Sequence, residues 1–103
     1  MIQRDNTQLV CVAEFRSLPG KETELIEVLH RLIEPTRKEQ GCLRYELNQR
    51  TDDPRRITFI EKWKDRTAFD DHCATPYIKT FFDQVRPLLV EEFEVKLYSE
   101  ILA

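Results

Sequence analysis

The fourteen residues FIEKWKDRTAFDDH, from Phe59 to His72, contain the change of periodicity that decides the fold. Up to Trp63, apolar residues alternate with polar ones, which is the period-two pattern of a β-strand. After Asp65, a residue type that caps helix N-termini, the apolar spacing becomes helical. The stretch therefore predicts a strand followed by a helix, with the only tryptophan and one of the two histidines on either side of the corner.

Two elements are predicted before this corner. Residues 8–16, QLVCVAEFR, predict a strand with apolar side chains on both faces. After Gly20, apolar residues recur with the i, i+3, i+4, i+7 spacing of an amphipathic helix. Pro35 is expected to end or kink this helix near Ile33 because its ring cannot donate a hydrogen bond, and Gly41 is expected to be a C-cap. The apolar stripe consists of Leu25, Val28, Leu29, Leu32 and Ile33.

A hairpin is predicted directly before the corner. Residues 42–50, CLRYELNQR, alternate between apolar and polar, and residues 57–64, ITFIEKWK, form the second strand. Between them, residues 51–56 have the composition of a turn. The side chains expected to point inward from the first of these strands are Leu43, Tyr45 and Leu47.

The C-terminal part completes the order β-α-β-β-α-β. Thr75 and Pro76 favour the start of a second helical segment as N-cap and first residue, and residues 92–100 predict the last strand. This order predicts an α+β, ferredoxin-like fold, in which a four-stranded antiparallel sheet carries helices on one face. Because the strands have apolar residues on both sides, a second copy of the chain is expected to cover the other face in a dimeric, barrel-like assembly.

Size and composition limit the function classes. The chain has 103 residues, enough for a single domain at residues 8–103 after a loose tail at residues 1–7. Net charge is −3 with scattered Lys and Arg, so no nucleic-acid partner is expected, and no apolar run is long enough to span a membrane. The polar N-terminus and three widely spaced cysteines indicate a cytoplasmic protein with free thiols. Without metal or nucleotide motifs, no cofactor is expected.

Glu61 and His72 are the candidate catalytic residues. Glu61 shares a strand face with Phe59 and Trp63, so it is either a salt-bridged carboxylate or a pocket-lining group whose pKa burial would raise. His72 can accept a proton near neutral pH, although a lone histidine on a helix is more often a packed or surface residue. Aromatic residues, including Tyr45, Tyr77 and Phe82, either form core or enclose a flat aromatic ligand.

Four motifs resemble the antibiotic biosynthesis monooxygenase family, and most closely its small quinol-monooxygenase-like members. They are AEFRSLPGKETEL, PTRKEQGCLRYEL, FIEKWKDRTAFDDH and TPYIKTF, and the resemblance runs from about Leu9 to the end. It implies a homodimer with a pocket between sheet and helices, in which quinols or related phenolic aromatics react with molecular oxygen without metal or flavin. It assigns catalysis to His72 and Glu61. For substrate binding it implies Trp63, with Tyr45 as a secondary candidate. Phe59, Tyr77 and Phe82 are also predicted to bind the substrate, because several aromatic residues around one place fit a pocket for a flat aromatic ligand.

The resemblance also leaves other functions open. Haem-degrading relatives have an asparagine where this chain has Phe15, which argues against that activity. Isomerases of phosphorylated diones have a similar TPxxKT helix signature, and in that case Lys79 would bind the phosphate. A small-ligand binding module without turnover is the third alternative, because fold alone does not settle function.

Overall fold

The computed structural model describes residues 7–101, and in this part of the chain the elements follow the predicted β-α-β-β-α-β order, with each helical region divided in two. The elements are β1 (Leu9–Arg16), α1 (Glu22–His30), α2 (Ile33–Arg37), β2 (Cys42–Arg50), β3 (Asp53–Trp63), α3 (Arg66–Cys73), α4 (Pro76–Val85), the 3-10 helix η1 (Arg86–Leu88) and β4 (Glu94–Ser99). No described helix is long and apolar enough to cross a membrane.

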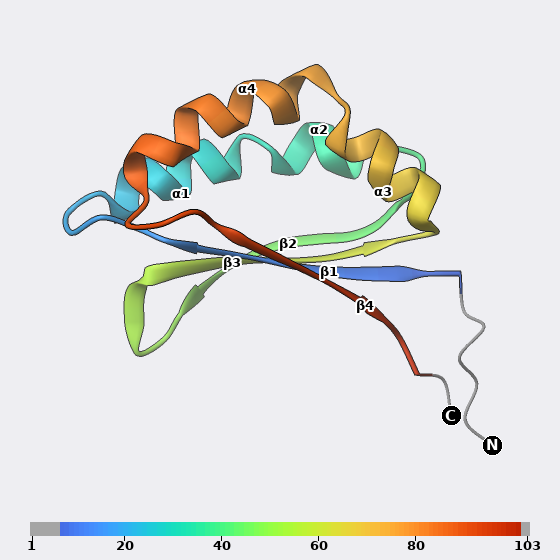
Figure 1. Ribbon diagram of the computed structural model, residues 1–103, viewed down its shortest axis with the longest axis horizontal. Coiled ribbons are helices and arrows are strands. Elements are labelled where there is room, and N and C mark those ends of the chain that lie inside the picture. The colour runs from blue at the N-terminus through green and yellow to red at the C-terminus, as the bar shows by residue number, and fades with distance from the viewer. Residues whose placement is uncertain (1–6, 102–103) are drawn as a thin grey trace.

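The four strands form one antiparallel sheet in the order β2-β3-β1-β4, and the helices all lie on the same face of it (Figure 1). The ferredoxin-like fold is therefore confirmed. In the register between the two central strands, Cys11 lies opposite Glu61 and Ala13 lies opposite Phe59. This register brings the inward row of β1 next to the inward row of β3, below the helices.

The core fills the space between the helices and the inner sheet face. Trp63 and Phe59 of β3 are almost completely buried there, as are Leu25 and Leu29 of α1. The predicted stripe of α1 thus faces the sheet, since Leu32 is also buried. Burial of side chains of this size, each stabilising by about 1.5–3 kcal/mol, provides much of the free energy of folding.

The first helical region is interrupted near Ile33, as predicted. Helix α1 ends at His30 and α2 begins at Ile33, so Pro35 lies inside the second helix. A proline cannot bond to the carbonyl four residues earlier, and its ring crowds that carbonyl. For Pro35 this carbonyl belongs to Arg31, which explains why the interruption comes one turn before the proline.

The prediction of a C-cap at Gly41 was wrong. Gly20 is the glycine with a positive φ, at 77°, whereas Gly41 has no such conformation. A Cβ atom at Gly41 would overlap the Cβ atom of Ala68 in α3. The residue before β2 is a glycine because α3 packs directly on it, and Lys64 at the end of β3 donates its backbone N–H to the Gly41 carbonyl at 2.9 Å.

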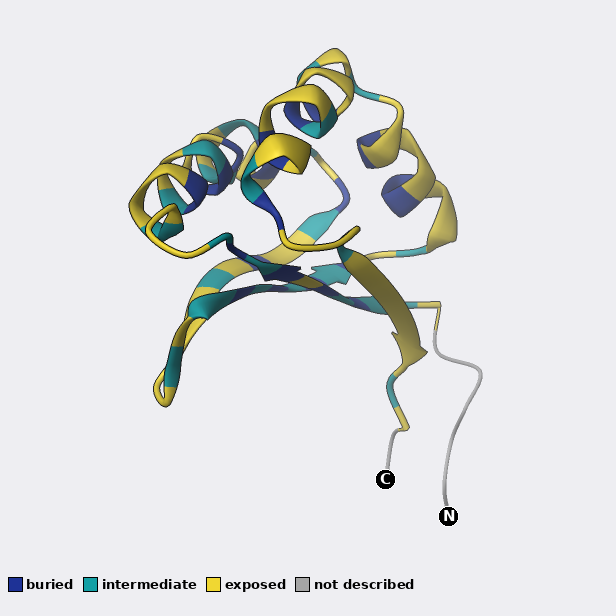
Figure 2. Ribbon diagram, turned by 60° about the vertical axis from the view of Figure 1, so that its left-hand side comes forward, coloured by how far each residue is buried: buried dark blue, intermediate teal, exposed yellow. Residues whose placement is uncertain are grey.

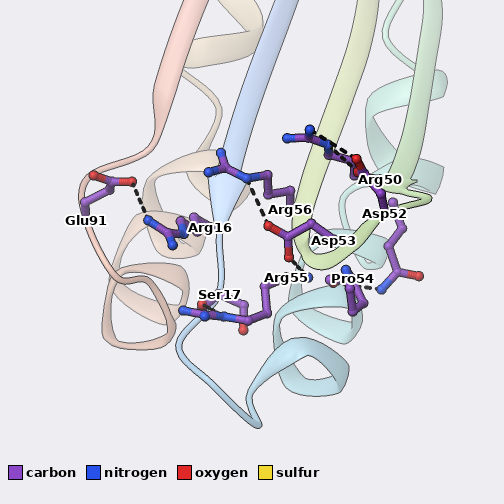
Figure 3. Close-up of polar contacts among 10 residues, drawn as sticks. Arg16, Ser17, Arg50, Asp52, Asp53, Pro54, Arg55, Arg56 and Glu91 are labelled. Atoms are coloured by element: carbon purple, nitrogen blue, oxygen red, sulfur yellow. Dashed lines mark hydrogen bonds and ion pairs between the residues drawn. The ribbon is translucent and has the colours of Figure 1, made fainter.

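The hairpin differs from the prediction in two ways. Leu43 was expected to point inward, but it is 50% exposed because the register shifts between Cys42 and Arg44 as in a β-bulge. The turn is shorter than residues 51–56, because β3 begins at Asp53. The Asp53 side chain accepts hydrogen bonds from Arg55 N and Arg56 Nε at 3.2 and 3.1 Å, which holds this end of β3 extended (Figure 3).

The helix boundaries near the corner follow the predicted caps only in part. Asp65 accepts a hydrogen bond from Ala68 N at 2.8 Å and caps α3 as predicted. Thr75 occupies the N-cap position of α4, yet its hydroxyl instead donates to the carbonyl of His72. This bond ties the end of α3 to the start of α4. The last strand begins at Glu94, two residues later than predicted, and η1 precedes it.

Candidate active site

A cavity lies between the inner face of the sheet and helices α3 and α4. Its empty volume is about 430 Å³ including the mouth, and the centre of a water molecule can occupy about 70 Å³ of it. Most of its lining is aromatic or aliphatic, and it includes six phenylalanines: Phe15, Phe59, Phe69, Phe81, Phe82 and Phe93. The lining residues with ionisable side chains are Cys11, Tyr45, Glu61, His72 and Cys73.

Glu61 reaches the cavity from β3 and is only 4% exposed. Its Oε1 accepts a hydrogen bond from Trp63 Nε1 at 3.0 Å, and the Cys11 thiol also bonds to the carboxyl group. Burial raises the pKa of Glu61 to about 7 because desolvation outweighs these two hydrogen bonds. Of the two alternatives that the sequence left open, the structure shows the pocket-lining carboxylate.

His72 lies on α3 and is 4% exposed. Its Nδ1 is 2.8 Å from Oε2 of Glu39, and its ring centre is 4.5 Å from that of Trp63. Burial lowers the pKa of His72, and the Glu39 carboxylate opposes this effect only in part. The ring is therefore neutral at pH 7. Because a carboxylate can only accept, this contact favours the tautomer that carries its proton on Nδ1.

Glu39 is a member of the site that sequence reasoning missed. It precedes β2 in the loop after α2, and its Oε2 also accepts a hydrogen bond from the Tyr77 hydroxyl of α4. Arg37 fixes this loop by donating Nε and Nη2 to the backbone carbonyl of Tyr45 at 3.1 and 2.9 Å. Glu39 and His72 are 33 residues apart, so no sequence spacing indicates their contact.

Three predicted aromatic residues line the cavity. Tyr45 of β2 stacks on Phe59 of β3, with ring centres 4.4 Å apart and planes inclined by 29°. Burial raises the pKa of the Tyr45 phenol, so it stays protonated at neutral pH. Phe82 of α4 lines the same cavity and stacks on Phe93, which sequence reasoning also missed. Together they form a flat apolar wall.

The other three predicted binding residues lie outside the cavity lining. Trp63 is fully buried and supports Glu61 and His72 from behind. Tyr77 contacts the site through its hydrogen bond to Glu39 and through an edge-to-face contact with the ring of His72, with ring centres 6.4 Å apart. Lys79 is an exposed residue of α4 and does not line the cavity.

The two thiols of the cavity are poor nucleophiles. Burial raises the pKa of Cys73 to about 11 and that of Cys11 still further, so both remain protonated at neutral pH. Between residues 7 and 101, no group of three or more His, Cys, Asp or Glu side chains is arranged to hold a metal ion.

The fold and the site define a small α+β protein with an apolar cavity whose wall contains two buried titratable groups, Glu61 and His72. Residues 8–84 match the antibiotic biosynthesis monooxygenase family, and the chain belongs to this family.

Known proteins agree with this assignment. The structure of protein SO0527 from Shewanella oneidensis is 50% identical, covers 100% of both chains and superposes with a TM-score of 0.93. A crystal structure described as an antibiotic biosynthesis monooxygenase is 30% identical, with a TM-score of 0.83, over 89% of this chain and 97% of the other. Protein sll1783 of Synechocystis is 32% identical over 88% of this chain, which spans only 62% of that relative. Of these three proteins, the one described as an antibiotic biosynthesis monooxygenase has a functional name, and that name agrees with the family assignment.

Proposed function

We propose that the protein is a cofactor-independent monooxygenase that oxidises quinols or related phenolic aromatics with molecular oxygen. One observation carries the proposal: Glu61 and His72 are two buried proton-transfer groups in the wall of an otherwise aromatic cavity. The aromatic lining suits a flat ring, and the two groups suit its hydroxyls. The family membership supports the same class of reaction.

In this mechanism His72 is the general base. Its Nε2 accepts the proton of a substrate hydroxyl, and the Glu39 carboxylate stabilises the imidazolium that forms. The phenolate is electron-rich and transfers electrons to oxygen. With a quinol, one oxygen atom becomes a hydroxyl group at a ring C–H position, and the other leaves as water with the two hydrogens of the quinol hydroxyls. The product is a hydroxyquinone, and because the quinol itself supplies the two electrons, no external reductant is needed. The apolar wall keeps bulk water from the anion.

Glu61 is the second polar contact for the substrate. With a pKa of about 7, it is present both as an acid and as a carboxylate at neutral pH. The acid form can donate to a substrate oxygen, and the carboxylate form can accept from a second hydroxyl. The Trp63 indole keeps the carboxyl group in place for either role.

The two alternative functions make different demands on the cavity. An isomerase of phosphorylated diones needs a cation for the phosphate, but the described lining contains no Lys or Arg and does contain Glu61. This arrangement favours an uncharged aromatic ring over a phosphate dianion. A binding module without turnover fits the same lining, so it is distinguished only by whether oxygen is consumed.

Oxygen consumption with reduced menadiol and related quinols tests the proposal, in buffer without added metal or flavin. We expect uptake above the rate of buffer alone, and a loss of about 10²- to 10⁴-fold in His72→Ala. His30→Ala is the matched control, because His30 is an exposed histidine of α1 away from the cavity. If the wild type consumes no oxygen with any quinol or phenol, the monooxygenase proposal fails.

We also propose that the protein works as a cytoplasmic homodimer. No part of residues 7–101 covers the sheet face opposite the helices, and all six residues of β4 are exposed (Figure 2). Val10, Val12 and Ile60 are half-buried on that face, with the exposed Tyr98 beside them. A second copy would bury this strip. The three free cysteines support a reducing compartment.

Light scattering coupled to size-exclusion chromatography tests the assembly. The wild type is expected to elute with twice the mass of the chain, and Val12→Glu is expected to shift it toward the monomer because it places a charge in the apolar strip. A wild type that remains monomeric at all concentrations would contradict the dimer.

A further inference from the structure

The contact between Glu39 and His72 occupies one of the two ring nitrogens of the candidate base, so only the other nitrogen is left to accept a proton. Nδ1 of His72 lies 2.8 Å from Oε2 of Glu39, while the ring lines the cavity. Among the described residues, no hydrogen bond involves His72 Nε2. A histidine held at one nitrogen by a carboxylate presents the other nitrogen as an acceptor, and its imidazolium form is stabilised by the adjacent negative charge.

Tyr77 fixes the carboxylate itself. Its hydroxyl donates to the same Oε2 that contacts His72, so Glu39 is held from α4 as well as through its own loop. Three elements therefore converge on one oxygen atom: the loop before β2, α3 with His72, and α4 with Tyr77. A carboxylate that served only to pair with solvent would not need two donors from different helices.

Glu39 also differs from His72 in its access to solvent. The side chain of Glu39 is 19% exposed, whereas that of His72 is 5% exposed. Glu39 lines a surface groove on the other side of the site, together with Gly41, Lys64, Asp71 and Thr75. The carboxylate thus stands between the buried histidine and a groove that small ions can enter.

We propose that Glu39 is the positioning residue of the site, which fixes His72 as the Nδ1–H tautomer and makes its Nε2 the proton acceptor toward the substrate. This inference rests on the proposed function for its catalytic part, because the substrate hydroxyl supplies the proton. The tautomer part rests on the contact alone.

The tautomer is measured without any substrate. Long-range ¹H–¹⁵N correlation spectra of the His30→Gln protein contain signals from a single histidine, His72. We expect the Nδ1–H pattern at pH 7.5, and a shift toward the Nε2–H form in Glu39→Gln and Glu39→Ala. An Nε2–H pattern in the wild-type background, or an unchanged pattern in Glu39→Ala, would overturn the proposal.

Steady-state kinetics then test whether Glu39 makes His72 a better base. Glu39→Gln and Glu39→Ala are expected to lower kcat about 100-fold with little change in KM, because the imidazolium loses its counter-charge. Glu34→Gln is the matched control, since Glu34 is an exposed glutamate of α2 paired only with Lys38. If both Glu39 variants keep kcat within about twofold, the positioning role is wrong.

Chemical rescue separates positioning from a structural role. Formate can enter the groove of Glu39→Ala and replace the missing carboxylate, so we expect it to restore kcat about tenfold in that variant and to leave Glu39→Gln unchanged. A loss that formate does not reverse would assign Glu39 a structural role instead. If the wild type shows the Nδ1–H tautomer but never consumes oxygen, the proposed function has failed while the contact stands.

Discussion

Trp63 donates its indole N–H to Oε1 of Glu61 over 3.0 Å, from two positions further along the same face of β3. A strand places residues i and i+2 side by side, so this contact follows from the local structure alone. It satisfies only part of the bonding capacity of a carboxylate. Burial consequently dominates, and the pKa of Glu61 rises to about 7.

The raised pKa predicts how stability changes with pH. In the folded state Glu61 keeps its proton up to about pH 7, whereas in the unfolded chain the side chain has its ordinary pKa of 4.5 and loses the proton there. The contribution of Glu61 to the free energy of unfolding is fully present below pH 4.5, and it is lost as the pH rises to 7. The unfolding free energy of Glu61→Gln, relative to the wild type, should therefore increase by up to about 3 kcal/mol across this window.

Urea unfolding at pH 4.5, 6 and 8 measures this difference. His72 acts in the opposite direction, since its lowered pKa makes stability fall as the pH drops below 6.5, and the comparison of the two proteins cancels that contribution. Glu27→Gln, at an exposed position of α1, is the control and should show no such trend. A constant difference between Glu61→Gln and wild type at all three pH values would contradict the raised pKa.

Gly41→Ala should destabilise the protein through a clash with α3. The added methyl group would overlap Cβ of Ala68, and both atoms belong to backbone-fixed positions. We expect a loss of about 1–3 kcal/mol in urea unfolding at pH 7. The double variant Gly41→Ala, Ala68→Gly should recover part of that loss, because it removes the opposing methyl group. Equal losses in the single and double variants would show that the clash is not the cause.

Asp65→Ala should remove the cap of α3. The carboxylate of Asp65 accepts from Ala68 N at 2.8 Å, and losing such a cap costs about 1 kcal/mol. Because α3 carries His72, we also expect reduced oxygen uptake. Asp65→Asn retains a capping oxygen and serves as the control in thermal unfolding. A similar loss for Asn and Ala would point to the charge rather than the hydrogen bond.

Phe93→Ala should enlarge the cavity. The Phe93 ring lies between those of Phe15 and Phe82, with centre distances of 5.0 and 5.6 Å and nearly parallel planes. Removing it opens a slot shaped for another flat ring. We expect kcat/KM to shift toward larger polycyclic phenols, with a loss of stability on the order of 2 kcal/mol. Kinetics with one-ring and three-ring quinols would measure this change in preference, and an unchanged preference would contradict a role of Phe93 in limiting the size of the substrate.

The fold was predictable because its signals are local. Alternation in residues 42–50 and 57–64, the helical stripe after Gly20 and the cap at Asp65 each depend on neighbours within a few positions. The errors came from contacts between distant segments. Gly41 has to be a glycine because Ala68 packs on it, and the residues next to Gly41 in the sequence do not indicate this contact. The bulge at Leu43 likewise depends on pairing with β3.

The same distinction applies to the site. Glu61 and His72 could be proposed from residue type and from the family resemblance, and the structure places both in the cavity wall. Glu39 could not be proposed, since its approach to His72 arises only when the loop before β2 and α3 pack together. Phe93 falls within residues 92–100, which the sequence predicts as the last strand, while in the structure it precedes β4 and lines the cavity.

The residues that line the cavity come from almost the whole length of the chain, from Cys11 in β1 to Val95 in β4. A molecule that occupies it would connect the first and last strands to α3 and α4 at once. Such a ligand stabilises only the folded state, and at a concentration 100 times its dissociation constant it adds about 2.7 kcal/mol. A rise in melting temperature can therefore reveal ligands in a compound collection before any reaction is known.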